Sequence, residues 1–170
     1  SADAGEVLTA AAILGRQVQL PMLTAVSGYP ERQVIEALEG ASRAGLLVDT
    51  GEAYVFSHDV VREVVETLGG SERRRMVHRQ AVAVLEAGGG DDSERNTRIS
   101  YHAVRGEAWE TAWRYLVRGG EQATSAGAVR AALRYYDEAL DLCPRLASSR
   151  PPVAAWVSSA MLPAAGLDRT

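Results

Sequence analysis

The stretch GLLVDTGEAYVFSHDVVRE, residues 45–63, decides how this chain is organised. Its two apolar runs, residues 46–48 and 53–57, are separated by a short polar segment that contains a glycine. Runs of this length on either side of such a segment predict a two-stranded hairpin. From His58 onward the apolar residues recur at helical spacing, so the hairpin is expected to lead directly into a helix.

Three helices are predicted ahead of this hairpin. Apolar residues recur every three or four positions over residues 3–14, 20–27 and 31–44, and a glycine follows each segment. That pattern is typical of amphipathic helices that end at a glycine. Three helices followed by a hairpin is the order of a winged helix, which we assign to residues 1–68.

A fourth helix is predicted over residues 59–68, directly after the hairpin. All of its large apolar residues are expected to face inward, namely Val60, Val61, Val64, Val65 and Leu68. The Gly-Gly pair that follows is expected to break the chain before a helix over residues 72–87, with Ser71 as its N-cap. Residues 88–92, GGGDD, have the composition of a flexible linker. We therefore expect residues 69–92 to be a helical connector with a linker.

The second half is predicted to consist of helical hairpins, with helices over residues 93–104, 107–125 and 127–142. Small residues beside large aromatic ones recur 20 residues apart, as AWRYL at 112–116 and ALRYY at 132–136. Stacked helical hairpins need small side chains where backbones approach and large ones to fill the remaining space. The second copy follows the pattern of the second helix of a tetratricopeptide repeat.

Pro144 is expected to stop the last of these helices. Beyond it, residues 156–161 fit the first turns of one more helix, within a proline- and serine-rich ending. We assign residues 93–170 to tetratricopeptide-like hairpins with an incomplete C-terminal tail. Because the chain also opens at Ser1 and not at Met, we expect it to be a fragment of a longer protein.

Composition narrows the possible chemistry. The 170 residues are 46% hydrophobic and 24% charged, an ordinary globular balance. All 18 basic residues are arginine, so this stretch contains neither the lysine of a phosphate-binding P-loop nor a Schiff-base lysine. Cys143 is the single cysteine, which excludes an internal disulfide, and the three scattered histidines do not complete a zinc site with it.

Neither a membrane nor an export signal is indicated. No run of about 18 uncharged apolar residues occurs, and acidic Asp3 and Glu6 stand where a signal peptide would carry basic residues. We expect a cytoplasmic protein. No catalytic spacing is found, and His78 and His102 look isolated on separate helices, so we assign them no role and expect a non-catalytic chain.

DNA binding through the third helix is disfavoured by charge. Residues 1–57 hold seven acidic residues against three arginines, and phosphate contacts normally require Lys or Arg. We therefore expect no direct nucleic-acid contact. The alternative, a stand-alone winged-helix DNA-binding regulator with a helical effector domain, would use Arg32 and Arg43.

Two features are candidates for binding. His58 and Asp59 lie where the hairpin meets the next helix, a position that favours an anion, although Asp59 also suits the start of a helix and His58 suits packing. The run Arg73, Arg74 and Arg75 is the densest basic cluster; it is either a solvated helix face or a surface for an anion or a partner.

The runs YVFSHDVVRE (54–63) and RRRMVHRQAVAVLE (73–86) resemble the region that follows the ATPase core in bacterial STAND-class regulators, many of them LuxR-type transcriptional activators. The resemblance covers roughly residues 5–143. It implies a winged helix that follows a nucleotide-binding module, then a tetratricopeptide-like superhelix. Members often carry a Met-His-Asp motif whose histidine reads the β-phosphate of ADP, which implies that role for His58, with Asp59 as its partner at the helix start and Ser57 in place of the Met.

We therefore expect a regulatory fragment of signal transduction and transcription regulation. The winged helix would clamp the nucleotide-binding module of the same protein, which would bind ADP or ATP, while this chain holds no cofactor itself. The helical repeats would present a surface for a protein or small-molecule effector, through Arg73, Arg74, Arg75, Trp113, Tyr115, Tyr135 and Tyr136. The alternative is that most of these aromatic residues belong to the core, as aromatic residues at helical spacing usually do. A regulatory arm fused to another enzyme is a further alternative that the sequence leaves open.

Overall fold

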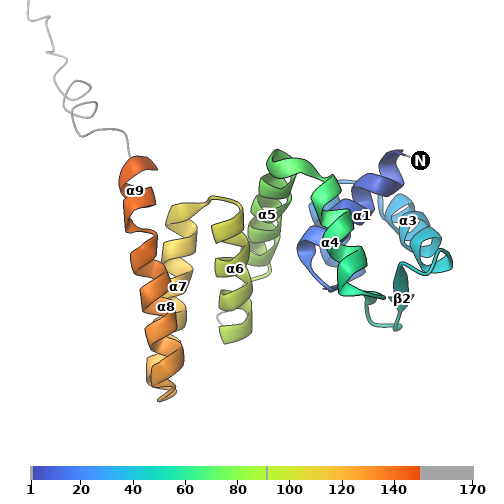
Figure 1. The fold of residues 1–170 in the computed structure, drawn as a ribbon. Coiled ribbons are helices and arrows are strands. Elements are labelled where there is room, and N and C mark those ends of the chain that lie inside the picture. The colour runs from blue at the N-terminus through green and yellow to red at the C-terminus, as the bar shows by residue number, and fades with distance from the viewer. Residues whose placement is uncertain (1, 91, 150–170) are drawn as a thin grey trace, which may run out of the picture.

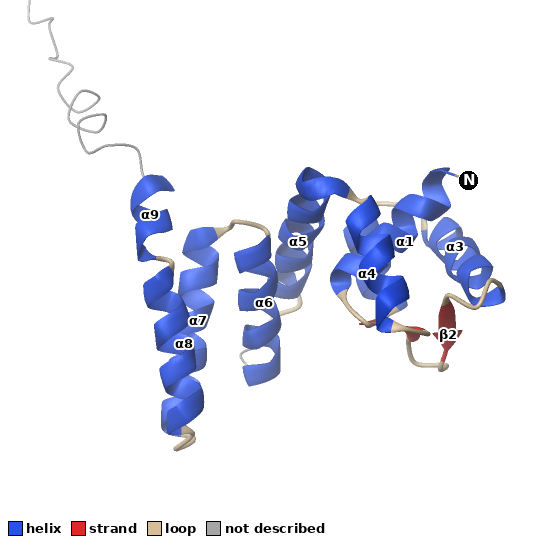
Figure 2. Ribbon diagram, in the orientation of Figure 1, coloured by secondary structure: helices blue, strands red, loops and turns tan. Residues whose placement is uncertain are grey.

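A computed structural model describes residues 2–90 and 92–149 of the chain. It is mainly helical, with one small three-stranded antiparallel sheet (Figures 1 and 2), which confirms the coarse fold class. The helices are α1 (Ala2–Leu14), α2 (Leu20–Ser27), α3 (Glu31–Arg43), α4 (Asp59–Leu68), α5 (Gly70–Ala87), α6 (Ser93–Arg105), α7 (Trp109–Ser125), α8 (Val129–Asp141) and α9 (Cys143–Ser149). The strands are β1 (Gln17–Val18), β2 (Leu47–Asp49) and β3 (Tyr54–Phe56).

The sheet contains a strand that the sequence pattern does not reveal. The predicted hairpin forms between β2 and β3, with Val48 opposite Val55. On the other edge of β3, the two residues of β1 pair antiparallel, with Gln17 opposite Val55 and Val18 opposite Tyr54. Two residues are too few to show an alternating pattern, so only the folded chain places them beside β3.

The first half of the molecule packs around α1. Five of its residues are almost completely buried: Val7, Ala10, Ala11, Ala12 and Ile13. They form one hydrophobic cluster with side chains from α2, α3, α5 and the sheet. The alanines bring the neighbouring helices close to α1, which therefore serves as the central helix of this half.

Helix α4 has the predicted bounds, but not the predicted orientation. Only Val61 and Val65 pack against the first cluster, and both are partly buried. Val60, Val64 and Leu68 are 69%, 55% and 76% exposed, so the prediction that all five apolar residues face inward is wrong. Five apolar positions in ten residues span more than one helix face, and α4 lies against α1 on one side only.

Helix α5 starts earlier than predicted and joins both halves. It begins at Gly70, so Ser71 lies in its first turn and is not its N-cap. Gly69 is required by close packing, because a Cβ atom there would lie 2.5 Å from Cγ2 of Thr9 in α1. Val77 of α5 enters the first hydrophobic cluster, and Val82 enters a second cluster built from α6, α7 and α8. The residues expected to form a connector therefore include a helix whose side chains are shared by both clusters.

The turns between α6, α7 and α8 repeat one backbone conformation. Glu107 has φ +55° and the following Ala108 has φ −90° and ψ +68°; Gly127 has φ +71° and Ala128 has φ −84° and ψ +65°. The hydrogen bonds match as well: the Ala108 N–H donates to the Ala103 carbonyl, and the Ala128 N–H donates to the Ala123 carbonyl. The internal sequence echo thus corresponds to a repeated turn.

The tyrosines in the second copy of the echo pack against two glycines of α7. A Cβ atom on Gly120 of α7 would lie 2.5 Å from the ring of Tyr136 in α8, and one on Gly119 would lie 2.9 Å from the ring of Tyr135. The two glycines thus allow the rings to lie directly against the backbone of α7. Helix α8 ends at Asp141, before Pro144 as predicted, but Pro144 lies in the first turn of a further short helix, α9, where proline is tolerated. The helix expected at 156–161 lies outside the described residues.

Candidate functional site

His58 and Asp59 lie at the junction of β3 and α4, as expected. His58 is the N-cap residue of α4, with an extended backbone, and its exposed side chain makes no capping hydrogen bond. The carboxylate of Asp59 lies 3.5 Å from Arg16 Nη1, and both side chains are mostly exposed. The imidazole thus faces solvent beside the first turn of α4, which corrects the alternative of a partly buried packing residue.

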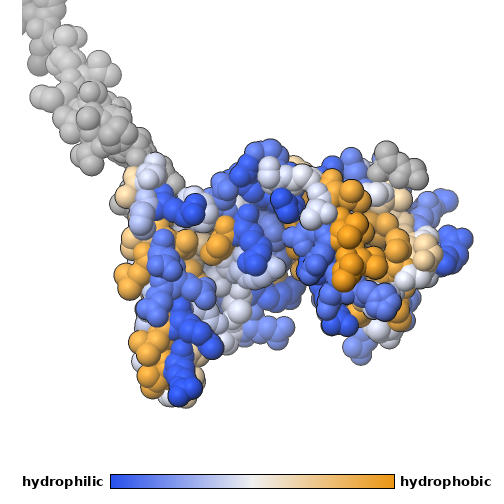
Figure 3. All heavy atoms as spheres, viewed as in Figure 1, coloured by the Kyte–Doolittle hydropathy of each residue, from blue (hydrophilic) through white to orange (hydrophobic). Residues whose placement is uncertain are grey.

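An apolar stripe begins immediately beside this junction. Val60, Val64 and Leu68 recur at intervals of four residues and lie along one face of α4. Figure 3 shows hydrophobic atoms gathered over this helix, between more hydrophilic regions. Contiguous apolar surface that is exposed marks an interaction site more often than scattered exposed residues do.

The three arginines of the basic cluster differ in their contacts. Arg73 Nη2 donates to Glu6 Oε2 at 2.6 Å, and the Tyr29 hydroxyl donates to the same oxygen at 2.6 Å. These hydrogen bonds lower the pKa of Glu6, with that of Arg73 the larger cause. Arg73 therefore holds α5 against the first half of the molecule and is not an open partner surface.

Arg75 is likewise engaged, whereas Arg74 is not. Arg75 forms ion pairs with Glu72 on its own helix and, at 2.9 Å, with Glu107 at the start of the α6–α7 turn. Within residues 2–90 and 92–149, half-buried Arg74 forms no hydrogen bond or ion pair. Of the three predicted partner residues, only Arg74 is available for an additional contact.

A buried histidine pair corrects the expectation that His78 and His102 are isolated. They lie on α5 and α6, each is 3% exposed, and their Nδ1 atoms are 2.8 Å apart. The Tyr101 ring is T-shaped relative to both imidazoles, and the Arg105 guanidinium lies 3.7 Å from the centre of the Tyr101 ring. A sequence signal was present, since each histidine occurs within the apolar stripe of its helix.

Burial keeps both histidines neutral. It lowers the pKa of His78 to about 4, and the positive charge of Arg105 adds to that shift. Burial lowers the pKa of His102 to about 3, with a further contribution from His78. Two neutral imidazoles joined through Nδ1 need one ring to donate and the other to accept, so the pair fixes opposite Nδ1 protonation states.

The aromatic residues expected to line a partner surface separate into core and surface. Tyr115 is 5% exposed within the second cluster, so its assignment to the surface is wrong. Tyr135 and Tyr136 pack on the α7 glycines and are partly buried. Trp113 is 42% exposed and lines a groove with Cys143 and Leu146, where α7 meets α9.

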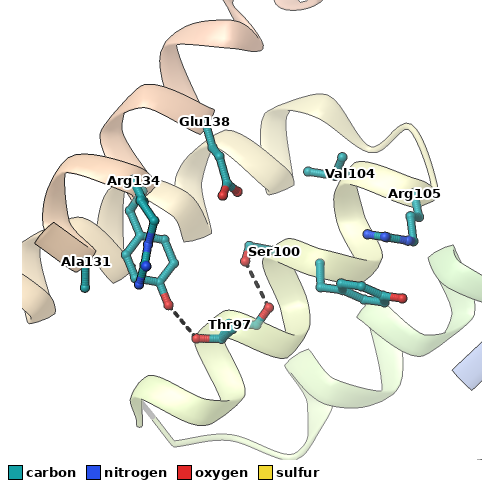
Figure 4. Close-up of a pocket in the computed structure, with 9 residues that line it drawn as sticks. Thr97, Ser100, Val104, Arg105, Ala131, Arg134 and Glu138 are labelled. Carbon is teal, nitrogen blue, oxygen red and sulfur yellow. Dashed lines mark hydrogen bonds between the residues drawn. The ribbon is translucent and has the colours of Figure 1, made fainter. Parts of the chain in front are cut away.

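A second groove lies between α6 and α8 (Figure 4). Thr97 and Ser100 of α6 face Arg134 and Glu138 of α8 across it. The Thr97 hydroxyl lies 2.6 Å from the Tyr135 hydroxyl and thus connects the two helices. Hydroxyl groups and both signs of charge line this groove, which gives it polar contacts for a partner or a small molecule.

Helix α3 uses its arginines internally. Arg32 Nε donates to Glu36 Oε1 at 2.9 Å, and Arg43 Nε donates to the Glu39 carbonyl at 3.3 Å. Both arginines thus form their hydrogen bonds within their own helix.

Two further features concern membranes and metals. None of the helices in the described part of the chain combines the length and the apolar character needed to cross a bilayer. Among the same residues, no three or more His, Cys, Asp or Glu side chains come together as a metal site.

No protein-family model matches the chain, and no solved structure matches it. Over 152 residues the chain is 28% identical to an uncharacterized protein of Rhizobium meliloti (strain 1021). The match covers 86% of this chain and 15% of that protein. The chain therefore spans only a small part of the length of the curated relative it matches.

Proposed function

We propose that the chain is a non-catalytic regulatory region of a STAND-class ATPase transcription regulator. In this proposal the first half is a winged helix that clamps the nucleotide-binding module of the same protein. The second half is a set of tetratricopeptide-like hairpins that binds an effector or a partner protein. ATP and ADP bind elsewhere in the protein, and its working compartment is the cytoplasm.

The order of elements supports the winged-helix part of the proposal. Three helices precede the β2–β3 hairpin, and β1 adds a third strand on the other edge of β3. The hairpin leads into α4 through His58, as the resemblance to STAND regulators implies. The long relative is also consistent with a chain that works as one part of a larger protein.

The repeated turn supports the tetratricopeptide-like part. Helices α6, α7 and α8 are joined by turns with one conformation, and the Tyr135 and Tyr136 rings pack on the α7 glycines. Units that repeat a turn and a small-to-large contact stack into superhelices and leave grooves between alternate helices. The groove between α6 and α8 is the corresponding effector surface.

The apolar stripe of α4 carries the proposal. Val60, Val64 and Leu68 expose branched side chains that a helix in an isolated module would normally bury. The stripe begins two residues after His58, in the first turn of the helix that His58 precedes. A nucleotide module packed on this face would bring a bound phosphate within reach of His58.

The proposed role of His58 is to stabilise the ADP-bound, closed state. A charge-assisted hydrogen bond from the imidazole to a phosphate oxygen contributes roughly 1.5–3 kcal/mol. A preference of that size shifts a two-state equilibrium by about tenfold to a hundredfold. Loss of the contact would therefore release ADP and raise basal activity.

The test uses the full-length protein encoded by the source gene. His58→Ala and Val60→Asp are each expected to accelerate ADP loss by about tenfold or more. Val129→Asp is the matched control, because Val129 is 66% exposed in the first turn of α8, as Val60 is 69% exposed in that of α4. An acidic residue suits the first turn of either helix, so both variants should fold.

Two results would overturn the proposal. One is a full-length protein without a GxxxxGK[ST] phosphate loop, because no ATPase core would then exist for the clamp to contact. The other is unchanged ADP retention in the His58→Ala variant. Equal effects of Val60→Asp and Val129→Asp would remove α4 as the docking face.

A further inference from the structure

A charged pocket lies where the end of α4 meets the start of α5 and the end of α6, away from His58. Its lining side chains are Glu66, Ser71, Arg74, Arg75, His78 and Arg105. The cavity measures about 270 Å³, which is room for several water molecules at about 30 Å³ each. It lies near the end of α4 opposite His58, about 15 Å along that helix.

The charges that line this pocket are not balanced. Three guanidinium groups face one carboxylate, and that carboxylate, Glu66, is already held by Arg62 at 2.6 Å. Arg75 is engaged by Glu72 and Glu107. In the described ranges 2–90 and 92–149, neither Arg74, which is half-buried, nor Arg105, which is exposed, has a carboxylate partner, and Arg105 stacks on Tyr101.

The surroundings of His78 carry the same charges. Burial lowers the pKa of His78 to about 4, and Arg105 and Arg74 add to that shift, whereas Glu66 opposes it. The neutral imidazole contributes no counter-charge to the pocket. Two guanidinium groups are therefore left facing an incompletely neutralised cavity.

We propose that this pocket binds a phosphate group, held by the guanidinium groups of Arg74 and Arg105 and by the Ser71 hydroxyl. Arginine presents paired N–H donors that match the oxygens of a phosphate. Helix α5 begins at Gly70, so its unpaired backbone N–H groups lie at the same end as these side chains. This site is independent of the nucleotide-sensing role proposed for His58.

Occupancy would tie the two halves of the molecule together. Ser71 and Arg74 lie on α5, whereas Arg105 lies at the end of α6, so one anion would bridge the helices on either side of the histidine pair. A ligand that binds only the folded chain stabilises it in proportion to the logarithm of its concentration over Kd. Phosphate should therefore stabilise the α5–α6 junction specifically.

The experiment measures the thermal unfolding midpoint in sodium phosphate against sodium chloride of equal ionic strength. Phosphate is expected to raise the midpoint of the unchanged chain. Arg74→Gln should remove most of that gain without loss of an existing contact, and Arg105→Gln should act in the same direction. Arg130→Gln is the control, because Arg130 is an exposed arginine at the start of α8 that lines neither this pocket nor the α6–α8 groove.

Nuclear magnetic resonance of the imidazole protons supplies a second measurement. Bound phosphate should raise the pKa of His78, and Arg74→Gln should abolish that rise.

Parallel measurements with ADP and with adenosine identify the source of the phosphate group. A nucleotide is assigned if the stabilisation depends on Arg74 and the affinity for ADP is at least tenfold higher than the affinity for orthophosphate. Equal affinities assign free phosphate. The proposal is overturned if phosphate acts no more strongly than chloride, or if Arg74→Gln retains the full gain. Neither result affects the His58 proposal.

Discussion

The two halves of the molecule build their cores in different ways. In the first half, one central helix, α1, contacts α2, α3, α4 and α5, which lie up to 60 or more residues away along the chain. In the second half, each of α6, α7 and α8 packs chiefly on its neighbour in sequence, through turns of one conformation. The first arrangement fixes a single shape, whereas the second can be extended by adding units.

The largest test of this comparison removes one buried leucine from each half. Leu38→Ala in α3 and Leu116→Ala in α7 should each lower the free energy of unfolding by about 2–5 kcal/mol. Because α5 places Val77 in one cluster and Val82 in the other, both halves are expected to unfold together.

Two spectroscopic probes separate the halves in that experiment. Every tryptophan follows residue 108, so fluorescence reports the second half, while circular dichroism reports all helices. The two midpoints should coincide in each variant. If Leu38→Ala left the fluorescence midpoint unchanged, the two halves would unfold independently, contrary to the expectation that they unfold together.

The next largest effect tests the contact between glycine and tyrosine. Gly120→Ala should lower the free energy of unfolding by about 1–3 kcal/mol, because the new Cβ atom would lie 2.5 Å from the Tyr136 ring. Gly40→Ala in α3 is the matched control, since nothing lies within 4 Å of the added atom. That variant should gain about 0.5–1 kcal/mol from helix propensity. Equal effects in urea unfolding would contradict the close packing of α7 on α8.

The histidine pair predicts an acid-sensitive junction between the halves. Folding lowers the pKa of both imidazoles, so the unfolded chain binds more protons, and stability should fall as pH drops from about 6.5 towards 4. Each histidine contributes at most about 1.4 kcal/mol per pH unit. The charged groups around the pair are Arg74, Arg98, Arg105 and Glu66.

Urea unfolding at several pH values checks this prediction. In the double variant His78→Gln/His102→Gln the stability should lose most of its dependence on pH in that window. His58→Gln is the control, because that imidazole is exposed and lies outside the buried pair. The pair would have no role in acid sensitivity if the double variant kept the original slope.

The smallest effect tests the repeated turn. Gly127→Glu places a side chain at φ +71° and should cost about 1–2 kcal/mol, because left-handed backbone is unfavourable for residues with a Cβ atom. Glu107→Gly at the equivalent position should change stability less, since relief of that strain is offset by loss of the ion pair with Arg75. A larger loss from Glu107→Gly than from Gly127→Glu, measured by thermal unfolding, would contradict the equivalence of the two turns.

Local patterns were enough to predict most elements. The bounds of α2 and α4 match the prediction, because each ends at a glycine and carries apolar residues at helical spacing. Strand β1 was not predicted, because two residues are too few to show an alternating pattern. The start of α5 was placed too late, because Ser71 is a residue type that favours the N-cap but lies one position inside the helix. Local signals therefore identify elements more reliably than they identify their exact ends.

The candidate sites depended more on long-range packing. The sequence placed His58 and Asp59 at a helix start, which needs only neighbouring residues. It could not show that Tyr115 is buried while Trp113, two residues earlier, is exposed, since that choice depends on which face of α7 meets its neighbours. It also could not show that Arg73 reaches back to Glu6, a contact across 67 positions.

Neighbouring residues and composition were sufficient to predict the helical class, the hairpin, the internal repeat at 112–116 and 132–136 and the absence of lysine chemistry. Only the tertiary structure showed which side of α4 is exposed, which arginine of the 73–75 run has no partner among the described residues, and that His78 and His102 meet. Those outcomes depend on how α1, α5 and α6 pack, and packing pairs residues whose separation along the chain carries no local signal.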